Sequence, residues 1–453
     1  MANSYLNRTT GSPSNADKVT ISAWVKKAKL GRQIIIGDYG SSTNRGKLQF
    51  SSSDQLEYYQ VDGGSATVQI TTNRLFRDPS AFYHIVMQYD SAQSTASDRL
   101  KLYVNGTQET SLANSTYPPQ NQDIRLNKSG VNLHIGQDGN SSDYLEGYIS
   151  HIALVDNAIS APTVFGETES TSGIWKFKSP TGVTWGNNGF HLKFENSGAM
   201  GTDSSGNTNT FTVNGNLKQS LDTPSNVYCT INPLFRNRFS NQETLTNGNL
   251  TMTTGPTDGD KAMLLGTLGV TKGKWYWECK VGTNKAQIGF AYNSINRFSD
   301  FYGSNSPSDG FAVYGDNGNV YYDGANTAYG SSWTTNDIIM VALDMDNKLA
   351  WLGKNGTWFN SATQTEIENG TATYDLTTKM STKQNLNSGE FVFPMFADMT
   401  GTGDMALNVN FGSGFFGTTA ITSAGSNGNG SLFEYDVPNG YYALNTKNIN
   451  TYG

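Results

Sequence analysis

The feature that most constrains this chain is an alternation of apolar and polar residues with a period of two. In WYWECKV at residues 275–281 and MALNVNF at residues 405–411, the odd positions are apolar. Successive side chains of a β-strand point to opposite faces, so each run predicts a strand with one face on a core and the other toward water. Residues 338–343 are apolar at every position, which predicts a central strand covered on both faces.

Turn signals separate these runs. Asn-Gly pairs at residues 105–106, 317–318 and 355–356 favour tight hairpins, because both positions tolerate positive φ. Charged residues make up 15% of the chain, below the usual value of about 25%, and Gly, Asn, Ser and Thr supply the polarity instead. A chain of 453 residues is too long to fold around a single hydrophobic core. The sequence therefore predicts an all-β protein with two antiparallel jelly-roll β-sandwiches in tandem.

Composition places the domain boundaries. We predict a first sandwich at residues 1–170, a loop-rich connector at 171–224 and a second sandwich at 225–415. Residues 416–453 begin with a Gly/Ser/Asn-rich stretch typical of a flexible linker and end in a tail with several aromatic residues. Two hypotheses stay open for this tail: it attaches the chain to a larger particle or to another copy, or it folds back on the second sandwich.

Charge and hydropathy exclude several classes of partner. The formal net charge is −7 without a basic block, so we expect no binding to nucleic acid. No stretch approaches the roughly 18 apolar residues of a membrane helix, so we expect no membrane insertion. Only two cysteines occur, Cys229 and Cys279, which favours synthesis in a reducing cytoplasm and stabilisation without disulfides.

Two known families resemble parts of the chain. FYHIV at residues 82–86, followed by LYVNG at 102–106, resembles a laminin-G-like or concanavalin A-like domain. GKWYWE at 273–278, IGFA at 288–291, DGFAVY at 309–314 and VALD at 341–344 are similar in order and spacing to SPRY domains. Both families are antiparallel sandwiches that bind carbohydrate or protein through loops. The resemblance implies a binding protein.

The arrangement as a whole resembles proteins of marine tailed phages, which are usually virion appendages. FRDPS at residues 76–80, the stretch 201–211 and VPNGYYALN at 437–445 carry this resemblance. It implies a head decoration, head fibre or tail fibre component, made in the host cytoplasm and displayed on the virion surface. The expected partners are other virion proteins and a glycan or protein of the host cell surface, and we expect a homo-oligomer. The alternatives are a glycan-degrading enzyme of the concanavalin A-like class and a cellular SPRY adaptor that binds peptides.

No catalytic constellation is visible in the sequence, so we expect that the protein is not an enzyme. Nucleophilic catalysis requires a Ser or Cys beside an oriented base. Three of the four histidines, His84, His134 and His151, lie within strand-like runs, and we interpret all four, including His191, as structural. Acidic residues at 344 and 346 resemble the alternating carboxylates of glucanases, but the second precedes a turn.

Aromatic residues beside amides are the candidate ligand-binding residues, because rings stack on sugars or anchor protein contacts. These candidates are Tyr302, Asn305, Tyr321, Tyr322 and Trp333. The alternative is that several of these rings close the ends of the sandwich. Asp203, in DSSGN at residues 203–207, is a candidate calcium ligand because Ca²⁺ prefers hard oxygen donors. Local turns produce the same composition, and no other cofactor is expected.

Overall fold

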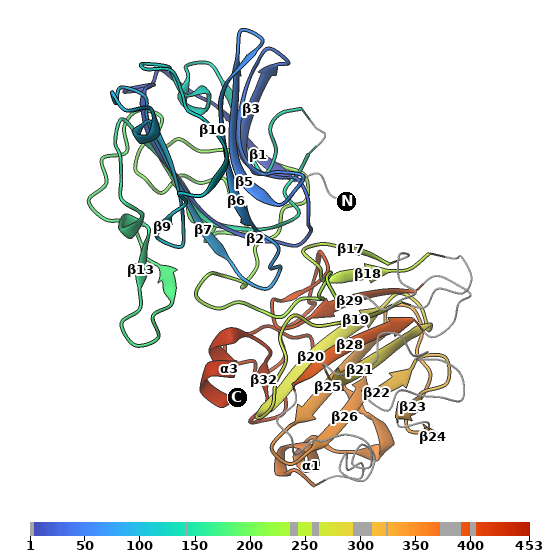
Figure 1. The fold of residues 1–453 in the computed structure, drawn as a ribbon. Coiled ribbons are helices and arrows are strands. Elements are labelled where there is room, and N and C mark those ends of the chain that lie inside the picture. Colours follow the sequence, from blue (N-terminus) through green and yellow to red (C-terminus); the bar gives the residue numbers. More distant parts are fainter. Residues whose placement is uncertain are drawn as a thin grey trace. The chain divides into compact units, whose positions relative to one another are not determined.

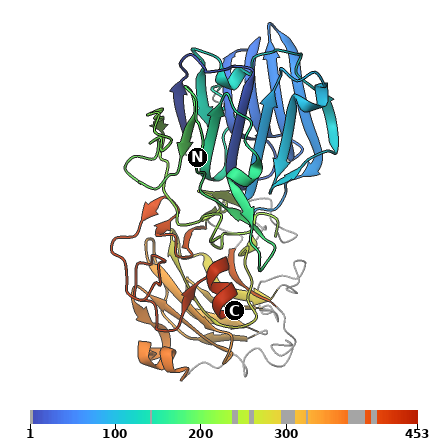
Figure 2. The same cartoon turned by 90° about the vertical axis from the view of Figure 1, so that its left-hand side faces the viewer.

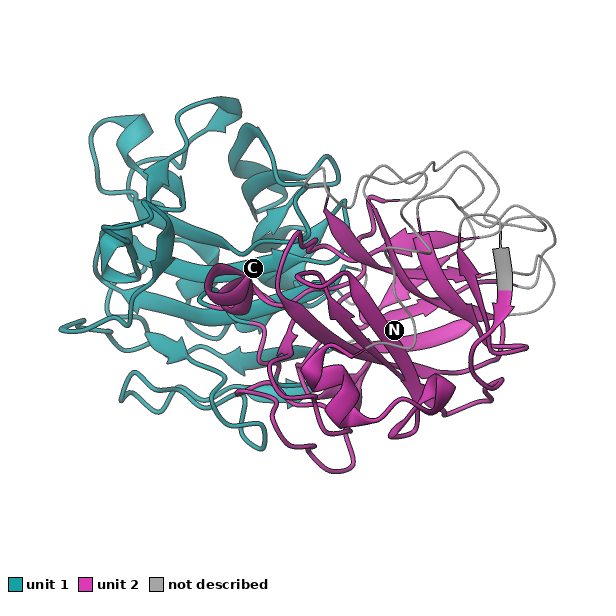
Figure 3. Cartoon of the chain, turned by 90° about the horizontal axis from the view of Figure 1, so that it is seen from below, with its two compact units in different colours: residues 1–219, 223–225 teal, residues 220–222, 226–453 magenta. Residues whose placement is uncertain are grey.

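A computed structural model describes two compact units (Figure 3). Unit 1 comprises residues 1–219 and 223–225, and unit 2 comprises residues 220–222 and 226–453. Within these units the described residues are 4–140, 143–235, 243–255, 262–292, 310–322, 325–371, 391–398 and 405–453.

Unit 1 is a sandwich of two antiparallel sheets (Figure 1). In spatial order, sheet 1 consists of β10 (Leu112–Thr116), β6 (Ser65–Leu75), β5 (Gln55–Asp62), β4 (Asn44–Phe50), β3 (Gln33–Ser41), β11 (Asn132–Ile135), β1 (Tyr5–Thr9) and β16 (Thr212–Asn214). Sheet 2 consists of β15 (Phe190–Leu192), β12 (Gly147–Asp156), β2 (Lys18–Lys27), β7 (Tyr83–Asp90), β8 (Leu100–Val104) and β9 (Thr107–Gln108). Short 3-10 helices lie at η1 (Ala96–Asp98), η2 (Arg125–Asn127) and η3 (Pro162–Val164).

The predicted connector supplies strands to unit 1. Its residues include β14 (Trp175–Phe177), which pairs with β13 (Gly166–Thr168) in a hairpin. They also include β15 at the edge of sheet 2 and β16 at the edge of sheet 1. The hairpin and the residues on either side of it lie against the outer face of sheet 2, where Phe165 and Trp185 pack on Ala153 and Val155. Covering an apolar sheet face explains why unit 1 extends beyond residue 170.

Unit 2 is a second antiparallel sandwich. Sheet 3 follows the order β17 (Thr244–Thr246), β18 (Thr251–Thr253), β29 (Ala406–Asn410), β20 (Lys274–Val281), β25 (Ile338–Asp344), β26 (Leu349–Lys354) and β27 (Thr357–Trp358). Sheet 4 follows the order β19 (Met263–Leu265), β28 (Val392–Asp398), β21 (Ala286–Tyr292), β22 (Gly310–Tyr314), β23 (Asn319–Tyr322) and β24 (Ala325–Ala328). A small hairpin joins β30 (Phe415–Phe416) to β31 (Thr419–Ala420).

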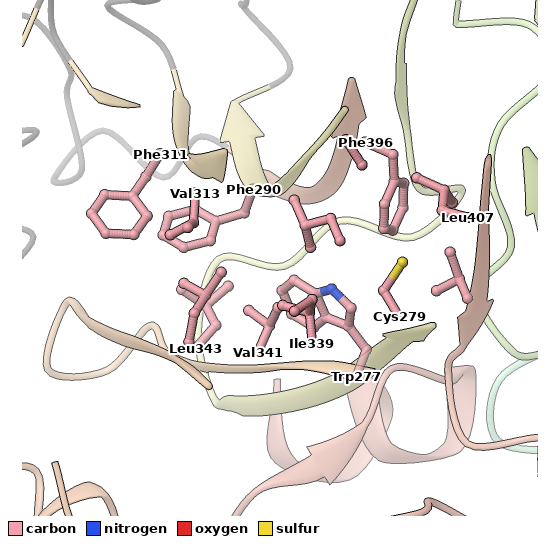
Figure 4. Packing of buried hydrophobic residues seen from close by; sticks show 14 of the residues in the cluster. Trp277, Cys279, Phe290, Phe311, Val313, Ile339, Val341, Leu343, Phe396 and Leu407 are labelled. Carbon is pink, nitrogen blue, oxygen red and sulfur yellow. The ribbon is translucent and has the colours of Figure 1, made fainter. Parts of the chain in front are cut away.

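The core of unit 2 follows the alternation of its strands. Trp277 of β20 and Val341 of β25 are fully buried and face side chains of sheet 4 such as Phe290 (Figure 4). Cys279 lies on the same face as a free, buried thiol. The Asn-Gly turn between β26 and β27 has φ values of 51° at Asn355 and 82° at Gly356, as the hairpin prediction requires.

The second face of sheet 3 is also buried, and the C-terminal tail covers it. Tyr276 and Met340 project from this face into a cluster that contains Phe433 and Tyr441 of the tail. The tail adds β32 (Tyr442–Ala443) parallel to β20 and ends in α3 (Thr446–Tyr452), the red helix in Figure 2. The prediction that this face of residues 275–281 points toward water is therefore wrong, because a segment more than 150 residues distant shields it.

The stretch predicted as a flexible linker has defined partners. Ser426 donates its backbone N–H to the Asp436 carboxylate, and Gly425 donates its own to the Phe433 carbonyl. Of the two hypotheses for the tail, the structure shows that it folds back on unit 2. Unit 2 also contains the helices η4 (Phe359–Ser361) and α1 (Gln364–Asn369). Among the described residues, no helix is long and apolar enough to cross a membrane.

Glu278 fastens the tail to sheet 3. Its side chain is fully buried, and its carboxylate accepts hydrogen bonds from the backbone N–H groups of Glu434 (2.8 Å) and Tyr435 (2.9 Å). The Tyr276 hydroxyl donates a third, at 2.9 Å. Burial raises the pKa of Glu278 to about 7, although these hydrogen bonds act in the opposite direction.

We expect Trp277→Ala to unfold unit 2 and leave unit 1 folded. The side chain is fully buried, and truncating such a Trp costs about 3–5 kcal/mol. Differential scanning calorimetry should show the transition of unit 2 lost or strongly lowered. Trp175→Ala, in the hairpin of unit 1, is the matched control and should affect the other transition. A melt of Trp277→Ala that superposes on wild type would contradict the core assignment.

We expect the free energy of unfolding of unit 2 to fall as pH rises from 4.5 to about 7, because folded Glu278 keeps a proton that the unfolded chain releases. The raised pKa of Glu278 corresponds to a stability contribution on the order of 3 kcal/mol. This contribution is fully present below the pKa of the unfolded chain and is lost above the pKa of the folded protein. Urea denaturation at pH 5 and pH 8 measures this. The free energy of unfolding of Glu278→Gln should lack this dependence on pH. The same change between pH 5 and pH 8 in both proteins would refute the assignment.

Candidate functional site

The face of sheet 1 that points away from the core gathers polar side chains from adjacent strands. Leu48 and Tyr58 belong to the core cluster, so Gln49 and Glu57, one residue along, project from the opposite face. The register pairs Gln49 of β4 with Glu57 of β5, and Glu57 with Thr71 of β6. Antiparallel pairing therefore brings three polar positions side by side.

Glu57 is the centre of a hydrogen-bonded network. Its Oε1 accepts from Gln49 Nε2 at 2.6 Å, and its Oε2 accepts from Thr71 Oγ1 at 2.9 Å and Gln69 Nε2 at 3.0 Å. Asn114 of β10 extends the network, because its Nδ2 donates to Gln69 Oε1 at 3.4 Å. Three donors hold the carboxylate in one orientation.

This network retains an unused acceptor and has a ring beside it. The Gln49 Oε1 atom is buried and has no hydrogen-bond partner within the described part of the chain. A buried polar atom without a partner costs free energy. Tyr59, half-buried on the same face, has the Arg45 guanidinium 5.7 Å from its ring centre. We name this surface the Glu57 face; it comprises Gln49, Glu57, Tyr59, Gln69, Thr71 and Asn114.

Three of the five sequence-based candidates for ligand binding are described by the structure, and all three are buried. Trp333 is 1% exposed and Tyr322 is 7% exposed, and both belong to the core of unit 2. Tyr321 is 6% exposed and its ring packs against Tyr314. This corrects the prediction for these three rings, since a buried ring offers no face for a sugar to stack on. Tyr302 and Asn305 lie outside the described residues.

The hydrogen bond between Ser22 and His84 runs in the wrong direction for a nucleophile and its base. The indole N–H of Trp175 donates to His84 Nδ1 at 2.9 Å, so this nitrogen carries no proton. The proton of the neutral ring is therefore on Nε2, which donates to Ser22 Oγ at 2.9 Å and leaves no base for the hydroxyl. Burial lowers the pKa of His84 to about 3, and Trp24 stacks on the ring at 4.6 Å.

The other histidines are held by aromatic stacking or by the backbone. His151 stacks on Phe177 at 3.6 Å, and His191 stacks on Trp185 at 5.7 Å. Burial lowers the pKa of both histidines to about 4, so both are neutral at physiological pH. His134 has its Nδ1 2.9 Å from the carbonyl oxygen of Asn132.

Local turns account for the acidic candidates. Asp203 Oδ1 accepts the N–H groups of His191 and Ser205, and its Oδ2 accepts from the Ser205 hydroxyl and the Asn209 N–H. Both carboxylate oxygens thus accept hydrogen bonds from the protein. These local turns explain the polar composition of residues 203–207 without a bound cation. Asp344 likewise accepts from Asn347 and pairs with Lys274 at 3.1 Å. Within the described ranges, no group of three His, Cys, Asp or Glu side chains is placed to hold a metal ion.

Two of the segments from which a phage resemblance was expected have structural roles in their own units. In residues 76–80, Phe76 is fully buried and Arg77 pairs with the Asp54 carboxylate at 3.2 Å. Lys27 makes a buried ion pair with the same carboxylate at 2.7 Å. Residues 437–445 supply much of the tail that covers sheet 3.

Sequence reasoning missed the Glu57 face. The sequence held one signal for it: carboxylate and amide residues alternate with apolar residues. Glu57, for example, lies between Leu56 and Tyr58. That pattern marks an outward position but does not reveal which strands are neighbours.

The family comparisons agree with this architecture. The model of the concanavalin A-like lectin/glucanases superfamily matches residues 2–165, and the SPRY domain model matches residues 274–374. No curated protein matches the chain.

Solved structures similar to the chain include the SPRY domain of human HERC1, with 19% identity over 40% of this chain and 96% of that chain, and a TM-score of 0.29. The TRIM65 PSpry domain has 12% identity and a TM-score of 0.28, and the match covers 40% of this chain and 91% of that chain. A heptameric SAP-like pentraxin from Limulus polyphemus has 12% identity over 47% of this chain and 89% of its own, with a TM-score of 0.30.

Both matches fall where the sandwiches lie, one in each unit. Concanavalin A-like and SPRY domains are binding domains. Residues 2–165 form a domain of the concanavalin A-like lectin/glucanases superfamily and residues 274–374 belong to a SPRY domain, so this chain carries the two in tandem.

Proposed function

We propose that this protein is a non-enzymatic binding protein whose Glu57 face binds a glycan. The observation that carries the proposal is the fixed network around Glu57, whose part-exposed Gln69 and Asn114 amides share a sheet face with the half-buried Tyr59 ring. Sugar hydroxyls both donate and accept hydrogen bonds, so amides and a carboxylate match them, and a ring offers a stacking surface. The neutral amides favour an uncharged glycan.

Hydrolysis is the rival activity for a concanavalin A-like domain, and it requires two carboxylates about 5–9.5 Å apart. Glu57 has amides and a hydroxyl as its neighbours instead of a second acid. Asp138, an acid on this side of sheet 1, packs over Gly37, which is two strands and two residues from Glu57, or about 12 Å at ordinary strand spacing. Asp138 is also paired with Lys47 at 3.3 Å. This spacing favours binding over catalysis.

The finer part of the proposal places this binding role on the surface of a tailed-phage particle. Its support is the sequence resemblance of residues 76–80, 201–211 and 437–445 to virion appendages. A single shallow site binds weakly, and a particle that displays many copies raises the effective concentration of each further contact. The partners are then neighbouring virion proteins and the host surface, and the chain is a homo-oligomer.

We expect Gln69→Ala to reduce glycan binding about tenfold, because one hydrogen-bonding group is lost and the Glu57 carboxylate is loosened. A glycan array followed by titration of the best-bound sugar measures this. Asn73→Ala is the matched control, since Asn73 lies on the same strand, is exposed and bonds only to Ser111 among the contacts described for its side chain. Equal loss in both variants, or hydrolysis of the bound glycan, would refute the proposal.

We expect antibodies raised against this chain to label the surface of phage particles in electron micrographs, many per particle. Purified protein should show a mass above that of one 49.2 kDa chain in light scattering. Absence of label from particles, with glycan binding retained, would remove the virion assignment and leave the binding proposal intact.

A further inference from the structure

The C-terminal segment 421–437, which we name the strap, forms one wall of a pocket in unit 2. The strap folds on itself through the Gly425 N–H to Phe433 carbonyl bond (2.9 Å) and the Val437 N–H to Ser426 carbonyl bond (3.0 Å). Glu278 fixes it to sheet 3 through two further backbone N–H groups. The strap lies beyond the residues that match the SPRY family.

The pocket has a volume of about 300 Å³. From sheet 3 and α1 it is lined by Met340, Gly356, Trp358 and Gln364, and from the strap by Ser423, Ala424, Gly425, Glu434, Tyr435 and Asp436. This volume is at the lower end of the range for ligand pockets, about 300–1,000 Å³, and suits one side chain better than a large ligand.

The base of the pocket is apolar and one side is aromatic. Met340 and Trp358 are buried in the cluster beneath the strap. The Tyr435 ring lies directly over Gly356, where an added Cβ would be 3.1 Å from the ring. A ligand with an apolar stem therefore finds contact surface beneath it.

The rim of the pocket is negatively charged. The lining holds two carboxylates, Glu434 and Asp436, and no Lys or Arg. Each carboxylate has one oxygen fixed by a strap N–H at 2.6 Å, from Thr422 and Ser426 respectively, and the Ser426 side chain also hydrogen-bonds to Asp436. Burial raises the pKa of Tyr435, and the nearby Glu434 carboxylate acts in the same direction.

We propose that this pocket binds an arginine side chain of a partner protein. A guanidinium is planar, stacks on aromatic rings and forms paired hydrogen bonds with carboxylates, while its aliphatic stem packs on apolar surface. Arginine is also enriched among the residues that dominate protein interfaces. The inference is independent of the glycan site, which belongs to the other unit.

The test uses the full chain and two small probes, N-acetyl-arginine amide and its uncharged isostere N-acetyl-citrulline amide, in calorimetric or NMR titrations. We expect the arginine probe to bind at least tenfold more tightly than the citrulline probe, and its binding to weaken as salt is added. Asp436→Asn and Glu434→Gln should each weaken it about tenfold, because each keeps the acceptor for the strap N–H and loses only the charge.

Glu195→Gln, an exposed acid in unit 1, is the matched control and should leave binding unchanged. Melting temperatures equal to wild type establish that the strap is intact in every variant. Equal binding of both probes, preference for a neutral monosaccharide over the arginine probe, or unchanged binding in both pocket variants would overturn the proposal.

Discussion

A β-sheet whose two faces are both apolar has to be covered on both, and this requirement organises unit 2. Strands β20 and β25 direct Trp277 and Val341 into the sandwich and Tyr276 and Met340 to the other side. The sandwich covers the first face, and the tail covers the second together with Tyr228 and with Ile367 of α1. The order of residues 416–453, the bonds made by Glu278 and the pocket under the strap all depend on this coverage.

Unit 1 meets the same requirement differently on its two outer faces. The outer face of sheet 2 carries Trp24 and His84, and the segment after residue 158 brings Trp175 onto them. The outer face of sheet 1 carries amides, Glu57 and Thr71, and its polar side chains satisfy one another instead of needing a cover. Glu57 and Thr71 are themselves buried, but Gln69, Asn114 and Tyr59 remain part-exposed on this face, which is why the proposed glycan site is on sheet 1 and not on sheet 2.

The two proposed sites differ in how they are built. The Glu57 face is formed by neighbouring strands of a rigid sheet, so its geometry is set by strand register. The pocket combines a sheet with a segment that arrives from the end of the chain, and its carboxylates are held by backbone N–H groups of that segment. Loss of strap contacts would therefore remove the pocket while leaving the sandwich core in place.

The sequence by itself determined the strands, the tandem sandwiches and the two families, because alternation and Asn-Gly turns are local properties of the chain. It also placed Trp277 inside and identified residues 338–343 as covered on both faces. Only the tertiary structure decided what lies over each outward face. The sequence left open whether Trp333 binds a ligand or closes the sandwich, and the structure buries it, whereas Gln49 and Glu57 became neighbours through pairing of separate strands. Periodicity specifies the direction of a side chain, but its surroundings depend on contacts between residues distant in sequence, which no local pattern encodes.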